Sequence, residues 1–240
     1  MKNSLTLKVS RLLSLAETAE NEREIRELVN EVFLRSAELH ELLCKESDPF
    51  ADRRTLSKCL RKLRTLNNNK ESSLTACEYN CVELDRLLES VCLCADILLS
   101  ECGSNVCFTA ERAVVSCCPT LIIDSFLNLI SNAVKFSNGG DVTARLSKRR
   151  RQCVVSVSNE GGRVLLPLKS GGGLKSVQNT ATLHGGRLLF SSGKTSFSAQ
   201  LAFSLDIPRG KYFEAPAFSQ YLENRFSPVY VGLCDCMNEV

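Results

Sequence analysis

The chain has 240 residues, of which 44% are hydrophobic and 24% are charged, and its formal net charge at pH 7 is +3. This length allows one or two domains with a substantial core, and so small a charge points to no particular class of partner. No apolar run approaches the roughly 20 residues of a membrane-spanning helix, and residues 1–11 show no secretory signal, so we expect a cytoplasmic protein without a membrane span.

The 13 cysteines are the most unusual part of the composition. None is spaced as Cys-x-x-Cys, and several, such as Cys59 and Cys92, occupy helix positions that suit a small hydrophobic residue. The odd count and the lack of a secretory signal predict reduced thiols rather than disulfides. A zinc or iron–sulfur site is disfavoured because the chain has only two histidines, and Cys234 with Cys236 is the pair best placed to form one.

Residues 1–73 are predicted to form a helical hairpin. Apolar residues recur at helical spacing through residues 22–45, and a second amphipathic helix follows Asp48 and Pro49, which suit a helix start. Two such helices cannot bury both apolar faces as an isolated pair, but a four-helix bundle made by two chains would. We therefore predict a homodimer.

The segment 126–136 is predicted to be a helix with two different faces. An apolar stripe occupies one face, while Asn128, Asn132 and Lys135 stand three and four residues apart on another. Amide oxygens can ligate Mg²⁺ and a lysine can hold a phosphate, so this face suits a polyanion and its cation. A solvated helix face is the alternative that this segment alone leaves open.

The basic run at residues 148–151 lies between two strand patterns, 141–146 and 153–157. The chain has no tryptophan, and no aromatic residues interleave with the basic run to stack on bases. A solvated hairpin turn is therefore favoured over a nucleic-acid or lipid patch, and we expect no nucleic-acid partner.

Two glycine-containing turns follow. A strand-like alternation ends at Asn159-Glu160-Gly161-Gly162, and Gly171-Gly172-Gly173 precedes a helical run that begins at Leu174. A glycine run before a helix lets backbone N–H groups approach phosphates. Gly185 is a typical helix stop, and another alternating strand occupies residues 195–203.

This ordered set resembles the ATP-binding domain of the histidine kinases, within the gyrase, Hsp90, histidine kinase and MutL superfamily. Asn128-x-x-x-Asn132-Ala-x-Lys135-Phe136 resembles the N box, Asn159-Glu160-Gly161-Gly162 a degraded G1 box, and Gly171-Gly172-Gly173-Leu174 the G2 box. Residues 183–187 and the strand at 193–203 resemble the closing segments. Four motifs in order over residues 74–206 make a specific signal. The resemblance implies an α+β fold, with a dimerising helical hairpin before an α/β sandwich whose mixed sheet is covered by helices on one face.

The resemblance also implies that the cofactors are ATP and Mg²⁺. Asn132 would ligate the metal with Asn128 in support, and Lys135 would meet the terminal phosphate. Asn159 would face adenine, and the glycines would seat the other phosphates at a helix N-terminus. The implied binding residues are Asn128, Asn132, Lys135, Asn159, Gly161, Gly171, Gly173 and Leu174.

Several positions depart from the family pattern. Asn159 stands where the family has an aspartate that bonds the adenine amino group, so the acceptor oxygen remains but the charge is lost. Arg163 and Lys169 replace glycines of the two boxes. Residues 163–170 are too few for the usual mobile lid over ATP.

The phosphoacceptor implied by the resemblance is His40, which is followed by Glu41, an acid able to orient the ring and take its proton. The family's Arg-Thr-Pro or its equivalent is missing, and His40 lies at the edge of the apolar stripe. A bundle histidine without chemistry is therefore the alternative. His184 is predicted to end a helix and to have no catalytic role.

Two functions from different classes follow. The first is a cytoplasmic histidine kinase that phosphorylates His40 from ATP and passes the group to a response-regulator receiver domain. The second is a non-catalytic dimeric phosphotransferase or adaptor with a degenerate ATP-binding domain, like the sporulation-type phosphotransferases. The lost aspartate and short lid favour the second, whereas the Asn128, Asn132 and Lys135 set favours the first. The tail at 207–240 has no predicted function, and a short helix is predicted at 217–225.

Overall fold

The computed structural model describes Arg64 and residues 78–100, 102–137, 139–160, 172–193, 196–205, 210–224 and 227–237. The rest of the predicted hairpin lies outside these residues, and so do His40, Gly161 and Gly171. None of the helices in the described ranges is long and apolar enough to cross a membrane.

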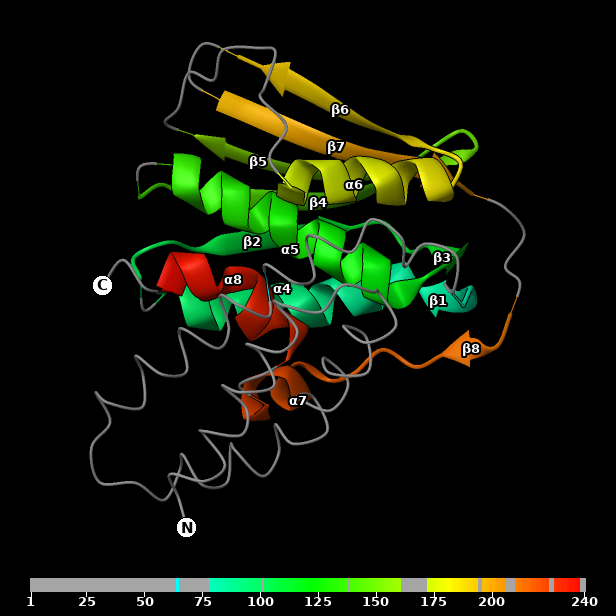
Figure 1. Cartoon of the computed structure of the whole chain (residues 1–240), viewed down its shortest axis with the longest axis horizontal. Coiled ribbons are helices and arrows are strands. Elements are labelled where there is room, and N and C mark those ends of the chain that lie inside the picture. The colour runs from blue at the N-terminus through cyan, green and yellow to red at the C-terminus, as the bar shows by residue number, and fades with distance from the viewer. Residues whose placement is uncertain are drawn as a thin grey trace, which may run out of the picture.

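A five-stranded mixed sheet forms one layer of the molecule (Figure 1). Its strand order is β2-β4-β5-β7-β6, with β2 and β4 parallel and the other neighbours antiparallel. The strands are β2 (Val106–Ala110), β4 (Val142–Arg149), β5 (Gln152–Glu160), β6 (Arg187–Ser192) and β7 (Ser196–Ser204). The alternation predicted at 153–157 belongs to β5, where Cys153, Val155 and Val157 are buried on one face.

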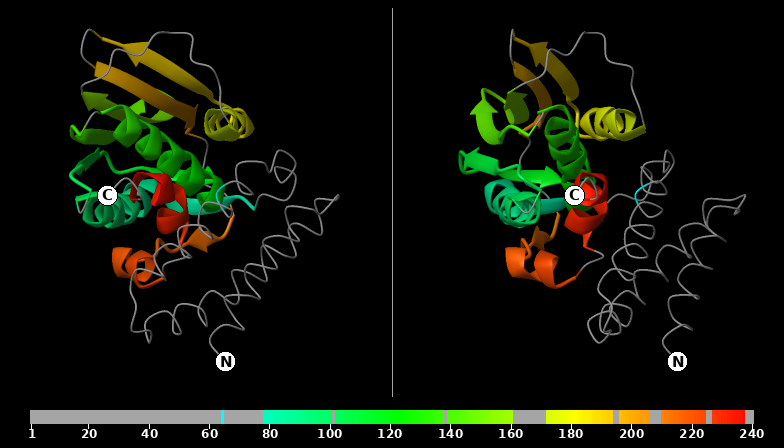
Figure 2. Two further views of the ribbon diagram at one scale, coloured as in Figure 1. Left: turned by 60° about the vertical axis from the view of Figure 1, so that its left-hand side comes forward. Right: turned by 90° about the vertical axis from the view of Figure 1, so that its left-hand side faces the viewer.

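Helices α5 (Pro119–Phe136) and α6 (Gly172–Leu183) cover one face of this sheet (Figure 2). The first residue of α5 is a proline, whose fixed φ suits a first helical turn. Phe126 and Ile130 of its apolar stripe are fully buried in the core. The predicted α/β sandwich, with a mixed sheet and helices on one face, is therefore confirmed.

A smaller sheet, β3-β1-β8, adjoins this layer. It contains β1 (Asn80–Glu83), β3 (Val114–Cys117) and β8 (Tyr212–Phe213), and α4 (Leu84–Ser100) follows β1 directly. Because β8 pairs in parallel with β1, the C-terminal tail returns to the domain. There α7 (Phe218–Glu223), the short helix predicted in the tail, packs on α4, and α8 (Pro228–Met237) packs on α5 and α4.

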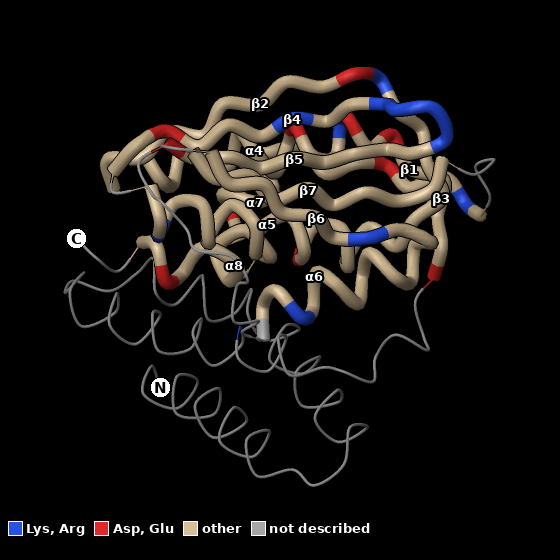
Figure 3. The backbone as a smooth tube through the Cα atoms, turned by 90° about the horizontal axis from the view of Figure 1, so that it is seen from above, with Lys and Arg blue, Asp and Glu red and all other residues tan. Residues whose placement is uncertain are grey.

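The basic run forms the turn between β4 and β5, as predicted (Figure 3). Arg149 and Gln152 are the last paired residues, and Arg150 has a φ of 55°. The four basic side chains therefore gather at one end of the sheet.

The prediction of reduced thiols throughout is wrong at Cys118, which is disulfide-bonded. Chain-wide rules on cysteine count and compartment do not determine the geometry at one position. Cys92, Cys117 and Cys153, in contrast, are free. Burial raises the pKa of Cys153 to about 12, so this thiol stays protonated and serves as a small core residue.

His184 ends α6, as predicted, and is buried between Tyr79 and Phe203, with ring centroids 5.2 and 6.0 Å away. Its Nε2 accepts a hydrogen bond from the Cys118 N–H at 3.1 Å, so Nδ1 carries the proton and donates to the Thr180 carbonyl at 2.7 Å. Burial lowers the pKa of His184 below its ordinary value, and the ring is therefore neutral in the folded protein.

Acidification from about pH 7 to about pH 5 is expected to destabilise the protein through His184. The folded pKa lies below the unfolded value of 6.5. The unfolded chain therefore binds more protons than the folded protein in this pH window. The contribution of neutral His184 to stability is present above the unfolded pKa and is lost as pH falls through the folded pKa. Urea unfolding at both pH values measures the slope. His184→Gln should reduce this dependence of the unfolding free energy on pH, whereas His40→Gln should not. The reverse pattern would contradict the assignment of the pH dependence to His184.

Candidate nucleotide site

The helix α5 carries the three polar residues singled out in the sequence. Asn128 is buried, with 7% of its surface exposed, whereas Asn132 is half-buried and Lys135 reaches the surface. Within the described part of the chain, the Asn132 side chain makes no hydrogen bond. Its amide oxygen is therefore available to a ligand.

The glycine turn and the N-box helix meet, as their resemblance to the family implies. A Cβ on Gly173 would lie 3.0 Å from the Asn128 Oδ1, so glycine is what lets the first turn of α6 come this close to α5. Leu174 is partly buried and packs against the core, which anchors that turn. The arrangement puts an amide oxygen beside the N-terminus of a helix, where backbone N–H groups favour an anion.

Asn159 lies at the end of β5 and has only 2% of its surface exposed. Its Nδ2 donates a hydrogen bond to the Phe136 carbonyl at 3.0 Å, but its buried Oδ1 has no partner among the described residues. An unpartnered buried acceptor is unfavourable by about 1–3 kcal/mol. A ligand that donates an N–H at this point, as an adenine amino group does, would remove that penalty.

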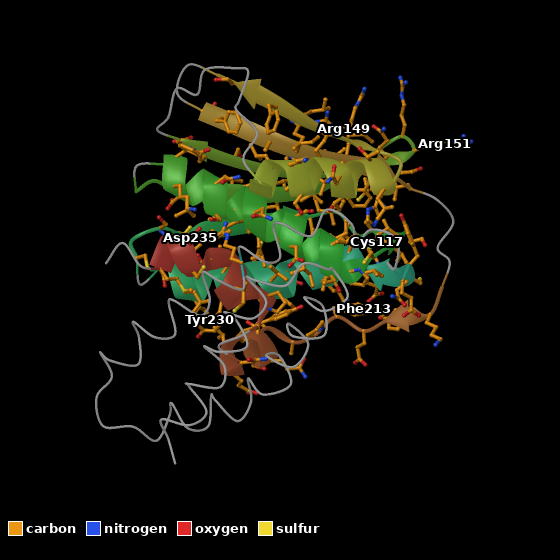
Figure 4. All side chains as sticks on the ribbon, in the orientation of Figure 1. Cys117, Arg149, Arg151, Phe213, Tyr230 and Asp235 are labelled. Carbon is orange, nitrogen blue, oxygen red and sulfur yellow. The ribbon has the colours of Figure 1, made fainter. Side chains whose placement is uncertain are left out.

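Lys135 is not free in this structure. Its Nζ is 3.1 Å from the Asp235 Oδ2 on α8, and the Arg64 Nη1 is 3.0 Å from the same oxygen. Figure 4 shows Asp235 on α8 facing α5. Although burial opposes its ionisation, the charges of Arg64 and Lys135 hold the pKa of Asp235 below its ordinary range.

A small cavity remains beside Asn128. Its lining comes from α5, α6 and α8, together with Arg64, and its volume is about 30 Å³. The lining residues are Arg64, Asp124, Asn128, Ser176, Pro228, Val231 and Gly232. That volume suits one water molecule, whereas small-molecule sites occupy roughly 300–1,000 Å³.

Metal binding at this site would depend on neutral ligands. The described residues contain no group of three or more His, Cys, Asp or Glu side chains arranged to hold a metal ion. Mg²⁺ accepts amide, water and phosphate oxygens. The Asn128 and Asn132 amides are the protein groups here that fit this chemistry.

The sequence identified the residues of α5, β5 and α6 but missed Asp235 and Arg64. Asp235 lies 100 residues from Lys135, between two cysteines in an apolar segment. No local pattern in the tail signals that one of its carboxylates faces the N-box helix.

Comparison with known proteins shows what this fold resembles. No protein-family model and no curated protein sequence matches the chain. Among solved structures, full-length ShkA in complex with AMPPNP has a TM-score of 0.52 at 16% identity, over 85% of this chain and 45% of that one. The histidine kinase ThkA in complex with the response regulator protein TrrA has a TM-score of 0.51 at 17% identity, over 77% of this chain and 64% of that one.

A third similar structure is the Acinetobacter baumannii histidine kinase AdeS, with a TM-score of 0.49 at 14% identity, over 86% of this chain and 96% of that one. At such identities the likeness to ShkA and ThkA establishes the fold alone. The described domain therefore has the fold of a histidine kinase ATP-binding domain, and the resemblance stated from the sequence motifs is confirmed at that level.

Proposed function

We propose that this protein binds Mg²⁺-ATP between α5 and the first turn of α6. The observation that carries the proposal is the approach of Gly173 to Asn128, which joins the N-box amides to a helix N-terminus. Asn132 ligates Mg²⁺ with Asn128 in support, and Lys135 meets the terminal phosphate. The similarly folded ShkA is in complex with AMPPNP, which is an ATP analogue, and this supports a nucleotide as the ligand.

The base end of the nucleotide is assigned to Asn159. Its unpartnered Oδ1 accepts the adenine amino group, and its neutral amide does so without the charge of an aspartate. Gly161, Gly171 and Leu174 complete the proposed site as parts of the two glycine boxes.

The proposed activity is that of a cytoplasmic, homodimeric histidine kinase. Residues 1–73 dimerise and present His40, residues 74–206 bind nucleotide, and residues 207–240 form the tail. Bound Mg²⁺-ATP supplies the phosphoryl group. A ring nitrogen of His40 forms the new bond to phosphorus as the bond to the departing ADP breaks, and Glu41 takes the ring proton. The group then passes to an aspartate of a response-regulator receiver domain, a partner supported by the ThkA–TrrA complex.

Two observations favour a second candidate. The cavity beside Asn128 is too small for phosphates, and Lys135 is paired with Asp235. A dimeric phosphotransferase or adaptor would need no nucleotide, and its His40 would receive the phosphoryl group from a partner.

Radiolabelled ATP distinguishes the two functions. A kinase incorporates acid-labile label from the γ-phosphate, and His40→Gln loses it. A phosphotransferase takes no label from ATP but takes it from a phosphorylated response regulator, again through His40. Label that persists in His40→Gln would contradict both assignments of the phosphoacceptor.

A further inference from the structure

We propose that α8 regulates the nucleotide site by competing with Mg²⁺-ATP for the N-box helix. Docked on α5, α8 closes the phosphate end of the site, and nucleotide binds when α8 leaves. This inference rests on the proposed nucleotide site and adds its regulation.

Three contacts show that α8 follows the C-terminal half of α5, from Leu127 to Lys135. A Cβ on Gly232 would lie 2.8 Å from the Leu127 Cβ, so the two helices touch there at backbone distance. One turn further on, the Cys236 Sγ lies 3.3 Å from the Ser131 Oγ, and Asp235 then meets Lys135. The contacts on α5 are four residues apart, so they form one continuous face.

At the end of this face, Lys135 and Arg64 form a cationic site that the Asp235 carboxylate occupies. The Asp235 carboxylate is shared by Lys135 and Arg64, and the Arg64 Nη2 also donates to the Ser131 Oγ at 2.9 Å. A lysine and an arginine around one carboxylate are the groups that hold a phosphate. Asp235 therefore takes the place proposed for the terminal phosphate at Lys135.

The remaining space supports the same conclusion. Pro228, Val231 and Gly232 of α8 line the cavity that also contains Asn128, and that cavity has a volume of only about 30 Å³. Removal of α8 would open it to solvent and would free Lys135. Nucleotide affinity is then reduced in proportion to the fraction of molecules in which α8 is docked.

Cysteine protection in the full-length chain tests this mechanism directly. Cys236 is 6% exposed against Ser131, whereas Cys153 is fully buried on β5. Saturating Mg²⁺-ATP is expected to raise the alkylation rate of Cys236 roughly tenfold or more, because the rate follows the population of the open state. The rate at Cys153, measured by mass spectrometry in the same sample, should not change.

Two variants test the competition from both sides. Asp235→Asn frees Lys135 and should strengthen Mg²⁺-ATP binding about tenfold, whereas Glu89→Gln, which removes an exposed carboxylate on α4, should not.

Ser131→Cys places a second thiol opposite Cys236. Oxidation should then lock α8 on α5 and abolish binding, and reduction should restore it, while the same treatment of the wild type serves as control.

The outcomes separate this inference from the proposed function. If Mg²⁺-ATP binds equally to the locked and reduced forms and leaves Cys236 protected, the nucleotide site stands and the regulation by α8 is wrong. If neither the wild type nor Asp235→Asn binds Mg²⁺-ATP in calorimetry, the nucleotide site itself is absent and the inference falls with it.

Discussion

Asn132→Ala is expected to abolish Mg²⁺-dependent ATP binding while leaving thermal unfolding almost unchanged. The Asn132 amide is the proposed metal ligand, and loss even of an outer-sphere partner typically lowers metal affinity about 10–100-fold. Asn132 is half-buried and makes no hydrogen bond within the described ranges, so its removal leaves no buried group unsatisfied. Calorimetric titration with ATP, with and without Mg²⁺, measures the effect.

A matched substitution distinguishes ligation from general damage to the helix. Asn132→Asp keeps an oxygen at the same position and should retain Mg²⁺-dependent binding. Gln178→Ala removes an exposed amide from the neighbouring α6 and should bind as the wild type does. Wild-type affinity for Mg²⁺-ATP in Asn132→Ala would rule out Asn132 as the ligand.

The central part of this site could be predicted because its signals are local. The amides and lysine of α5 stand at helical spacing beside an apolar stripe, so their shared face follows from periodicity alone. Gly173 comes just before a helical run, where a close approach of backbone is typical. The structure brings Asn128 and Gly173 together, although they are far apart in the sequence.

The parts that could not be predicted depend on contacts between distant segments. The pairing of β8 with β1 involves only two residues on β8, too few to leave a strand pattern in the sequence. The α8 helix is apolar, with buried Val229, Val231 and Leu233, so its sequence shows that it packs but not against which surface. The ion pairs of Asp235 depend on that packing. They show that Lys135 is paired with a carboxylate rather than free to meet a phosphate.

The largest effect on stability is expected for a substitution in the His184-Gly185-Gly186 segment, which follows α6. Gly186→Ala is expected to lower the free energy of unfolding by about 3 kcal/mol or more. The added Cβ would overlap the carbonyl oxygen of Ala202 and lie 2.6 Å from the Cα of Phe203, both in the backbone of β7. A paired strand cannot rotate such atoms away, so β6, β7 or the end of α6 must shift.

Gly185→Ala is the control for this prediction, since it introduces the same methyl group one residue earlier. Gly185 has a φ of +66°, but the nearest atom to its added Cβ is the Ser204 Cβ at 3.8 Å, so the substitution meets backbone strain without a clash. That strain amounts to about 1 kcal/mol. Urea unfolding followed by circular dichroism measures both variants against the wild type. A loss in Gly186→Ala no larger than that in Gly185→Ala would contradict the close approach of the Gly186 backbone to β7.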